Sequence, residues 1–281
     1  MLLELGDRNF DLTDRSLVMG ILNRTPDSFY DRGSYWDLDA FYRRAEQQVH
    51  GGADILDVGG VKAGPGPEVS EEEEMERVAP VVSGLRDRFD VALSVDTWRA
   101  SVAEECFRVG AVMGNDISGF ADPEYLPTAA KAGAAVVATH IRLMPRVADP
   151  NPQYVDVVGE VSSFLTERAA RAKAEGIPDS RIVLDAGLDL GKTAAQSVEL
   201  LRASGRLAAL GWPLMLSASN KTFLGMTFGL EIGERWEATL AAHALGVSLG
   251  CRIIRAHDVH AARRVSDTIA AVLESVDSAA E

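Results

Sequence analysis

Eight short apolar runs, each followed by a longer helical pattern, constrain the fold of this 281-residue chain more than any other feature. The runs lack the polar–apolar alternation of a half-exposed strand, so each predicts a strand buried on both faces. They span Leu17–Leu22, Ala53–Val58, Val91–Val95, Ala111–Met113, Ala134–Ala138, Arg181–Leu184, Pro213–Leu216 and Arg252–Ile254. Such alternation predicts parallel strands joined by right-handed crossovers.

The segments between the runs carry helix start and stop signals. Ser70 before Glu71–Glu74 is typical of an N-cap followed by acidic residues at the positive end of a helix. The predicted helices are Leu38–His50, one starting at Glu71, Arg99–Val109, Pro123–Ala132, Tyr154–Glu175, Thr193–Leu210, Glu234–Leu249 and Val259–Glu274.

Eight strand–helix units match the (β/α)₈ or TIM barrel, an α/β fold that is usually roughly 250 residues long. A doubly wound sheet is the alternative, but it requires no particular number of units. We therefore expect one barrel domain over residues 16–281. The short N-terminal extension, residues 1–15, is a candidate for a small hairpin over the barrel bottom.

Charge and cysteine content limit the class of partner. The chain has 42 acidic and 28 basic residues, a net charge of −14, and so lacks the basic field that binds nucleic acid or an anionic membrane surface. The two cysteines, Cys106 and Cys251, form neither a disulfide framework nor a metal-ligand pattern. With no visible export signal and no apolar stretch of membrane-spanning length, we expect a cytoplasmic protein.

Polar residues collect where each predicted strand ends, which in a barrel is the mouth that carries chemistry. They are Asn23, Asp57, Asp96, Asn115 with Asp116, His140, Asp185, Ser219 with Lys221, and Arg255 with His257. Any one of them could be a helix cap or a satisfied buried group. Together they predict a binding site.

The mixture of polar groups indicates a ligand type. Asp96, Asn115 and Asp185 offer acceptors and an amide that suit a flat ring with N–H donors and a carbonyl. Lys221, Arg255 and His257 are cationic or can become so, which suits phosphate oxygens, although Arg255 could instead pair with a nearby acid such as Asp57. The oxygen of Asn23 could ligate Mg²⁺ on a phosphate.

Seven motifs, in order along nearly the whole chain, resemble the dihydropteroate synthase family. The first, Asn23-Arg-Thr-Pro-Asp-Ser-Phe29, is similar to that family's N-V-T-P-D-S-F. The others are Ala53–Gly60, Ser94–Thr97, Asn115–Gly119, Asp185-x-Gly187, Lys221–Gly225 and Arg255–Val259. The resemblance implies a homodimeric barrel transferase of folate biosynthesis, which joins a pterin alcohol pyrophosphate to para-aminobenzoate.

The resemblance also implies roles for individual residues. Asp96, Asn115, Asp185 and Lys221 would line the pterin pocket. Asn23, Arg255 and His257 would hold the pyrophosphate, with Mg²⁺ as cofactor and Asn23 as its protein ligand. Para-aminobenzoate, or a sulfonamide- or sulfone-like ligand, would be the second small-molecule partner.

The departures from the family pattern concentrate on loops. The family's second loop, G-G-E-S-T-R-P-G, reads here Gly59–Gly66 with Lys62, Ala63 and Gly64, so a Thr and an Arg are missing. Asp189 replaces a glycine, which adds a carboxylate near the expected pterin floor and strains the backbone if φ must be positive. Asn220 replaces the Arg of the family's S-R-K-S. Arg24, Tyr30 and Arg32 are new in the first loop.

Three functions remain open. The first is a divergent homologue, a possible pseudoenzyme, that binds pterin but has weak or absent synthase activity. The second is an active dihydropteroate synthase in which Arg24, Arg32 and Lys62 supply the missing cations. The third is a pterin-dependent methyltransferase domain, which Thr25–Phe29 and the Arg255/His257 pair disfavour. We favour the first because the changes fall on loops that the chemistry needs.

Two further segments carry expectations. Glu234–Leu249 is rich in Ala and Leu and contains Trp236, so it predicts a homodimer through the late helices. Arg142–Gln153 is long and rich in proline, and is either a mobile lid or a surface connection.

Overall fold

The computed structural model describes residues 1–25 and 38–277, without the side chains of residues 274–277. Eight parallel strands close into a barrel in the order β10-β3-β4-β5-β6-β7-β8-β9. The strands are β3 (Leu17–Asn23), β4 (Ile55–Gly59), β5 (Ala92–Asp96), β6 (Met113–Asp116), β7 (Ala135–Thr139), β8 (Ile182–Asp185), β9 (Leu214–Leu216) and β10 (Cys251–Ala256). The predicted TIM barrel is therefore confirmed.

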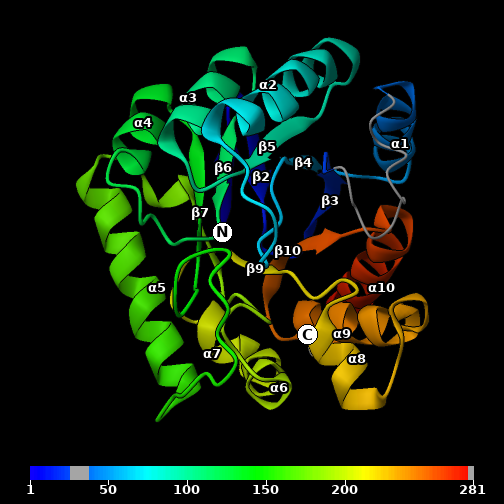
Figure 1. The fold of residues 1–281 in the computed structure, drawn as a ribbon. Helices are drawn as coiled ribbons and strands as arrows, with labels where there is room; N and C mark the ends of the chain where they lie inside the picture. Colours follow the sequence, from blue (N-terminus) through cyan, green and yellow to red (C-terminus); the bar gives the residue numbers. More distant parts are fainter. Residues whose placement is uncertain (26–37, 278–281) are drawn as a thin grey trace.

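Helices surround the strands on the outside of the barrel (Figure 1). They are α1 (Leu38–His50), α2 (Glu71–Arg88), α3 (Ala100–Val109), α4 (Tyr125–Ala132), α5 (Val157–Ala174), α6 (Ala194–Arg202), α7 (Ser204–Ala208), α8 (Thr222–Phe228), α9 (Trp236–Ser248) and α10 (Val259–Asp277). In the part of the chain that the structure describes, the 3₁₀ turns η2 (Asp179–Arg181) and η3 (Ile232–Glu234) lie between them. Within the described residues, no helix is long and apolar enough to cross a membrane.

Local capping explains several boundaries. The Ser70 hydroxyl accepts a hydrogen bond from the Glu73 N–H and starts α2, as the sequence predicts. The predicted helix from Tyr154 begins only at Val157, because the Asp156 side chain caps it. The predicted helix Thr193–Leu210 is divided into α6 and α7 at Ala203, which leaves the helical conformation.

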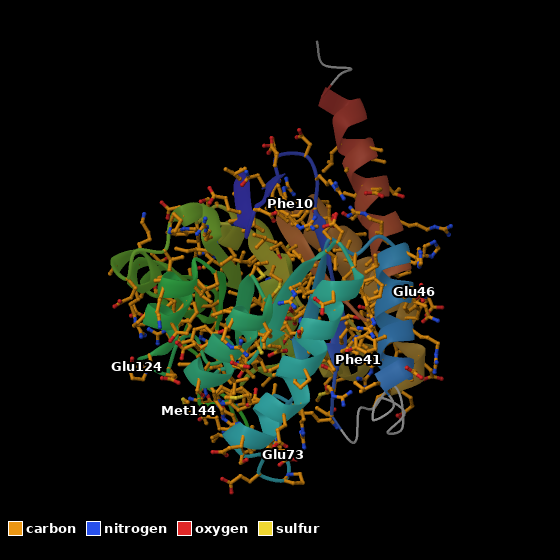
Figure 2. All side chains as sticks on the ribbon, turned by 90° about the horizontal axis from the view of Figure 1, so that it is seen from above. Phe10, Phe41, Glu46, Glu73, Glu124 and Met144 are labelled. Atoms are coloured by element: carbon orange, nitrogen blue, oxygen red, sulfur yellow. The ribbon has the colours of Figure 1, made fainter. Side chains whose placement is uncertain are left out.

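A two-stranded antiparallel hairpin closes the end of the barrel opposite the mouth. It consists of β1 (Leu2–Leu5) and β2 (Arg8–Asp11). Leu3 and Leu5 are fully buried and belong to the same apolar cluster as Met19 and Ile55 of the strands. Figure 2 shows Phe10 of the hairpin at one end of the molecule, with Glu73 and Met144 at the other. Burial of each leucine stabilises the fold by roughly 1.5–3 kcal/mol. The hairpin therefore closes one end of the barrel, and the loops that follow the strands lie at the other end.

Candidate functional site

A row of polar residues crosses four neighbouring strands at the mouth. Strand register places Asn23 beside Gly59, Gly59 beside Asp96, and Asp96 beside Asn115. A Cβ atom on Gly59 would lie 3.4 Å from the Asp96 Cβ and 3.6 Å from the Asn23 Oδ1. A Cβ atom at position 59 would therefore make ordinary van der Waals contact with both residues, which shows that Asn23 and Asp96 flank this position.

Arg255 connects this row to a second carboxylate, that of Asp57. Its Nε donates to Asp57 Oδ2 at 2.7 Å and its Nη2 donates to Asp96 Oδ2 at 2.6 Å. The cation expected to hold pyrophosphate is thus already paired with two acids, and the pairing with Asp57 that the sequence also allowed is present. Fully buried Asp57 further accepts from Ser94 Oγ at 2.6 Å and from Asn115 Nδ2 at 3.0 Å.

Burial sets the charge state of Asp96. Loss of solvent raises the pKa of Asp96 to about 7, although the Arg255 guanidinium opposes this shift. Neighbouring acids, with Asp57 the first of them, raise that pKa further. The Asp96 carboxyl group therefore changes its protonation state in the neutral pH range, and could accept or donate a hydrogen bond toward a ligand.

Asp185 and Lys221 form the opposite part of the same mouth. Asp185 accepts from the Gly187 N–H through Oδ1 and from Ser217 Oγ through Oδ2, both at 2.7 Å. Lys221 Nζ donates to the Leu188 carbonyl at 2.6 Å. Burial lowers the pKa of Lys221, while Asp185 and Asp189 favour its charged form. All four residues assigned to the pterin role by resemblance thus lie at the mouth.

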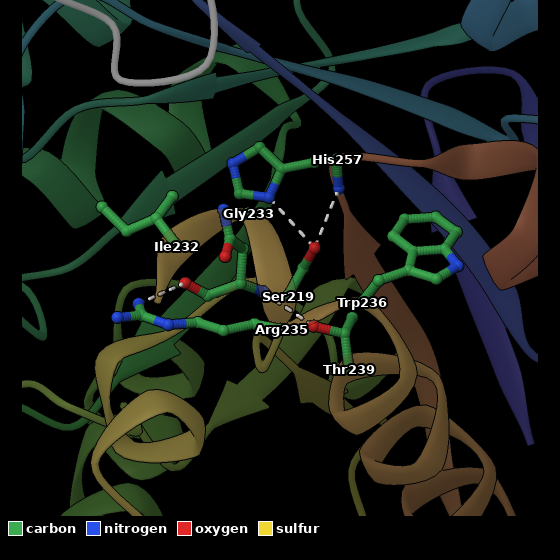
Figure 3. Close-up of a pocket in the computed structure, with 8 residues that line it drawn as sticks. Ser219, Ile232, Gly233, Arg235, Trp236, Thr239 and His257 are labelled. Atoms are coloured by element: carbon green, nitrogen blue, oxygen red, sulfur yellow. Dashed lines mark hydrogen bonds between the residues drawn. The ribbon is translucent and has the colours of Figure 1, made fainter. Parts of the chain in front are cut away.

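His257 lies beside Ser219 at the edge of a small cavity of about 60 Å³ (Figure 3). Its Nδ1 is 3.0 Å from Ser219 Oγ, which also accepts from the His257 backbone N–H at 3.2 Å. Burial, followed by the nearby Arg255 and Arg44, lowers the pKa of His257 to about 4. At neutral pH the His257 imidazole is therefore uncharged in this environment and can act as a hydrogen-bonding group.

Asn220 lies in the same cavity, at the position where the family pattern has an arginine. Its backbone is left-handed, with φ 55°, and its N–H donates to Thr239 Oγ1 at 3.0 Å. Arg235 Nη1 donates to the Asn220 carbonyl at 3.2 Å (Figure 3). The Arg235 guanidinium therefore reaches the residue that stands at the position of the family's arginine, but it bonds to the backbone carbonyl of Asn220.

Asp189 also contacts backbone. It has φ 68°, a left-handed conformation that an aspartate adopts with strain. Its carboxylate accepts from the Phe223 N–H at 3.1 and 3.2 Å, at the start of α8. The carboxylate expected near the pterin floor thus acts as a cap for the helix that follows Lys221.

The second loop borders a cavity of about 160 Å³. Ala63, Gly64 and Pro65 form one wall, and the residues after β7 and β8 form the others. No atom lies within 4 Å of a Cβ built on Gly64, so the missing arginine leaves open space. In the first loop, the Arg24 guanidinium lies 5.9 Å from the centre of the Phe41 ring, whereas Tyr30 and Arg32 lie outside the described residues.

Several supporting residues were not assigned from the sequence. Ser94 of β5 holds Asp57, and Ser217, which directly follows β9, holds Asp185. Each serine stands two positions before another mouth residue, and this spacing was an available signal in the sequence. Lys192 Nζ lies 2.9 Å from His140 Nδ1 and donates to the carbonyls of Gly187 and Leu190 at 2.8 and 3.0 Å. Burial, aided by the nearby Lys221, lowers the pKa of Lys192 to about 7.

Asn23 is the residue at the mouth that the sequence assigned as a ligand of Mg²⁺. Among the described residues, no group of three or more His, Cys, Asp or Glu side chains could hold a metal ion. The Asn23 amide oxygen is a hard ligand at the mouth, and Mg²⁺ commonly uses one or two protein oxygens together with substrate phosphates and water.

Comparisons with known proteins agree with this architecture. A family model described as "Pterin binding enzyme" matches residues 19–257. "Inactive dihydropteroate synthase 2" of Mycobacterium leprae is 42% identical over 265 residues, covering 92% of this chain and 91% of that protein. "Dihydropteroate synthase" of Clostridium beijerinckii is 37% identical over 260 residues, covering 92% and 94%.

A solved structure gives the same fold. The Yersinia pestis dihydropteroate synthase with a sulfonamide drug complex is 36% identical, covers 98% of this chain and 100% of its own, and superposes with a TM-score of 0.93. The shared barrel, the matched family model and these identities together show that the chain belongs to the pterin-binding enzyme family and is dihydropteroate synthase-like.

Proposed function

We propose that this protein binds a reduced pterin at the barrel mouth and forms dihydropteroate weakly or not at all. One contrast carries the proposal. Asp96, Asn115, Asp185 and Lys221 lie together with hydrogen-bond partners, whereas positions 63 and 64 offer neither a hydroxyl nor a guanidinium. The "inactive" name of the Mycobacterium leprae relative supports this assignment.

The pterin half of the mouth suits the edge of a pterin ring. That edge presents N–H donors and a carbonyl, which match carboxylate acceptors and an amide. Asp185 is oriented by Ser217 and by the Gly187 N–H, so its remaining acceptor sites are fixed before a ligand arrives. Lys221 adds a donor from the far side of the pocket. Such preorganisation lowers the entropy cost of binding.

The chemistry of the family explains why the loop matters. Breaking the C–O bond to pyrophosphate requires stabilisation of the leaving anion and of the developing pterin cation, together with a positioned amine. Two missing contacts in the transition state, at roughly 1.5–3 kcal/mol each, correspond to about a hundred-fold or more in rate. The Arg146 guanidinium reaches the second loop and the Arg235 guanidinium reaches Asn220, but both donate to backbone carbonyls.

Pyrophosphate and Mg²⁺ belong to the same proposal. Asn23 would hold Mg²⁺, which neutralises charge on the leaving group when it is bound. The neutral His257 would donate a hydrogen bond to a phosphate oxygen. Arg255 would donate to pyrophosphate only through the N–H groups that its hydrogen bonds with Asp57 and Asp96 do not use. If Arg255→Ala leaves pyrophosphate affinity unchanged, this assignment of Arg255 is wrong.

A steady-state assay with the dihydropterin pyrophosphate, Mg²⁺ and para-aminobenzoate tests the proposed activity. We expect turnover at least a hundred-fold below the ordinary enzyme range, and an increase of tenfold or more in the Ala63→Thr/Gly64→Arg variant. Glu68→Gln, an exposed change on the same loop, is the matched control and should give no increase. A wild-type kcat/KM of roughly 10⁴ M⁻¹s⁻¹ or above would instead establish an active synthase, as the Clostridium beijerinckii relative is named.

An exposed apolar surface supports a homodimer. It is formed by Met226, Phe228, Ile232, Trp236 and Leu245, whose side chains are between 36% and 70% exposed. They belong to α8, η3 and α9, which lie near one another (Figure 1). Exposed apolar side chains that are concentrated on consecutive elements indicate an interface more strongly than scattered single ones do. Light scattering should give about twice the 30.2 kDa chain mass, and a monomer at micromolar concentration would refute the dimer.

A further inference from the structure

Arg146, in the connection between β7 and α5, holds the second loop by three contacts. Its backbone N–H donates to the Ala63 carbonyl at 2.9 Å. Its guanidinium donates to the Lys62 carbonyl at 3.3 Å through Nη1 and to the Pro67 carbonyl through Nη2. One side chain thus bridges both ends of the segment 62–67, which includes both positions where the family's Thr and Arg are missing.

The backbone of Arg146 is itself constrained. Its φ is 66°, a left-handed conformation that costs free energy for a residue with a Cβ atom. Such strain persists only where the surrounding contacts fix the conformation, and it is concentrated at functional positions. The strained turn presents both the N–H and the guanidinium of Arg146 to the same loop.

The connection that carries Arg146 is anchored in turn. Arg142 Nη2 pairs with Asp149 Oδ1 at 2.8 Å within the connection. At its end, the Tyr154 hydroxyl donates to the Gly191 carbonyl at 2.8 Å, and Gln196 Nε2 donates to the Pro152 carbonyl at 3.4 Å. The connection is therefore tied to the loop after β8 through Tyr154 and to α6 through Pro152.

The cavity of about 160 Å³ lies where these three loops meet. Ile141, Leu143 and Val147 give it an apolar wall opposite Ala63 and Pro65. Release of Arg146 would detach the wall formed by the second loop. The shape of the cavity therefore depends on the guanidinium contacts.

We propose that Arg146 is a positioning residue that holds segment 62–67 in one docked conformation and thereby shapes the cavity for the second ligand, a small aromatic amine. The statement about the ligand rests on the proposed function. The statement about the loop does not, because it concerns contacts within the chain alone.

Hydrogen exchange of the peptide covering residues 60–67 tests the loop. We expect amide exchange there to be at least tenfold faster in Arg146→Ala, and tryptic cleavage after Lys62 to increase similarly. Arg146→Lys, which can reach only one of the two carbonyls, should be intermediate. Arg86→Ala is the matched control, because Arg86 donates to the Val109 carbonyl across two other elements and should not affect this peptide. Unchanged exchange in both Arg146 variants would overturn the proposal.

Sulfanilamide binding in the presence of pterin and pyrophosphate tests the cavity. We expect its affinity to fall at least tenfold in Arg146→Ala, while pterin affinity changes less than twofold. Equal sulfanilamide affinity in the wild type and in Arg146→Ala would overturn the role of Arg146 at the cavity. If the loop loosens but sulfanilamide binds no variant, the positioning of the loop stands and the proposed second ligand fails.

Discussion

The two sides of the barrel mouth differ in what their polar groups contact. On the side proposed to bind pterin, called the pterin side below, Arg255 donates to both Asp57 and Asp96, and Asp185 accepts from Ser217, which directly follows β9. On the side of the second loop, Arg146 and Asp189 bond to backbone carbonyls and N–H groups. The first side is a network of side chains on strands, and the second consists of loops held by backbone contacts.

This difference indicates how a binding site can persist while a reaction is lost. Side chains on the barrel strands are fixed by register, so one substitution there disturbs several partners. At a loop position such as Gly64, a Cβ atom would have no atom within 4 Å, so a side chain there can change without cost to the fold. A loss of activity through such loops would therefore leave the proposed pterin site intact.

The largest expected effect is on the stability of the pterin side. Asp57→Ala leaves buried Arg255 without one partner and removes the acceptor of Ser94 and Asn115. We therefore expect the free energy of unfolding to fall by about 3–5 kcal/mol. Urea denaturation measures this change. Asp87→Ala, which removes a solvent-exposed partner of Arg86, is the control and should cost less than about 1 kcal/mol. If Asp57→Ala lowers the free energy of unfolding no more than the control does, the side-chain network of the pterin side does not stabilise the fold, and the contrast with the loop side fails.

A smaller effect is expected from pH. Because the pKa of Asp96 lies at about 7, its carboxylate is the acceptor for a pterin N–H only at higher pH. Pterin affinity should therefore rise by about tenfold between pH 6 and pH 8, and Asp96→Asn should remove this dependence. Fluorescence titration across this range measures both proteins, and a pH-independent wild-type affinity would exclude Asp96 from the site.

The protonation of Asp96 should also affect the free energy of unfolding, which should fall with rising pH, whereas pterin affinity rises. The pKa of Asp96 is raised from its ordinary value of 3.8, so folding favours the protonated form. Its stabilising contribution is present below about pH 4 and is lost as pH rises through about 7. Asp96→Asn should flatten this part of the dependence of the unfolding free energy on pH.

The smallest expected effect concerns Asp189 on the loop side. Asp189→Ala loses the cap of α8 and retains a positive φ, so it should destabilise the fold by about 1–2 kcal/mol. Asp189→Gly loses the same cap but relieves the backbone strain, so its net change should lie within about 0.5 kcal/mol of zero. Thermal unfolding of the pair distinguishes them, and equal losses would show that the left-handed backbone carries no strain.

The sequence predicted the barrel well because its signals were long and repeated. Buried strands read as uninterrupted apolar runs, and seven of the eight predicted helix regions correspond to single helices. Helix α8 was missed because it is short and contains Gly225, which obscures its pattern. Strand ends were shifted where polar mouth residues are themselves part of the strand, as in Met113–Asp116.

Placement of the mouth residues was predictable, but their contacts were not. Strand order brings Asn23, Asp96 and Asn115 to one level, and this follows from the alternation of strands and helices. The neutral state of His257 depends on burial, and the cap formed by Asp189 depends on how two loops meet. The hydrogen bonds from Arg146 to the second loop join residues about eighty positions apart in the sequence. Local sequence patterns carry no information over such a separation.

Calorimetric titration with 6-hydroxymethyl-7,8-dihydropterin tests the central claim most directly, because it reports on the pterin side without requiring turnover. We predict that the wild type and Ala63→Thr/Gly64→Arg bind with equal affinity. Asp185→Asn, which loses a charged acceptor worth about 1.5–3 kcal/mol, should bind at least tenfold more weakly. Absence of binding to the wild type, or equal affinity of Asp185→Asn, would contradict a retained pterin site at the barrel mouth.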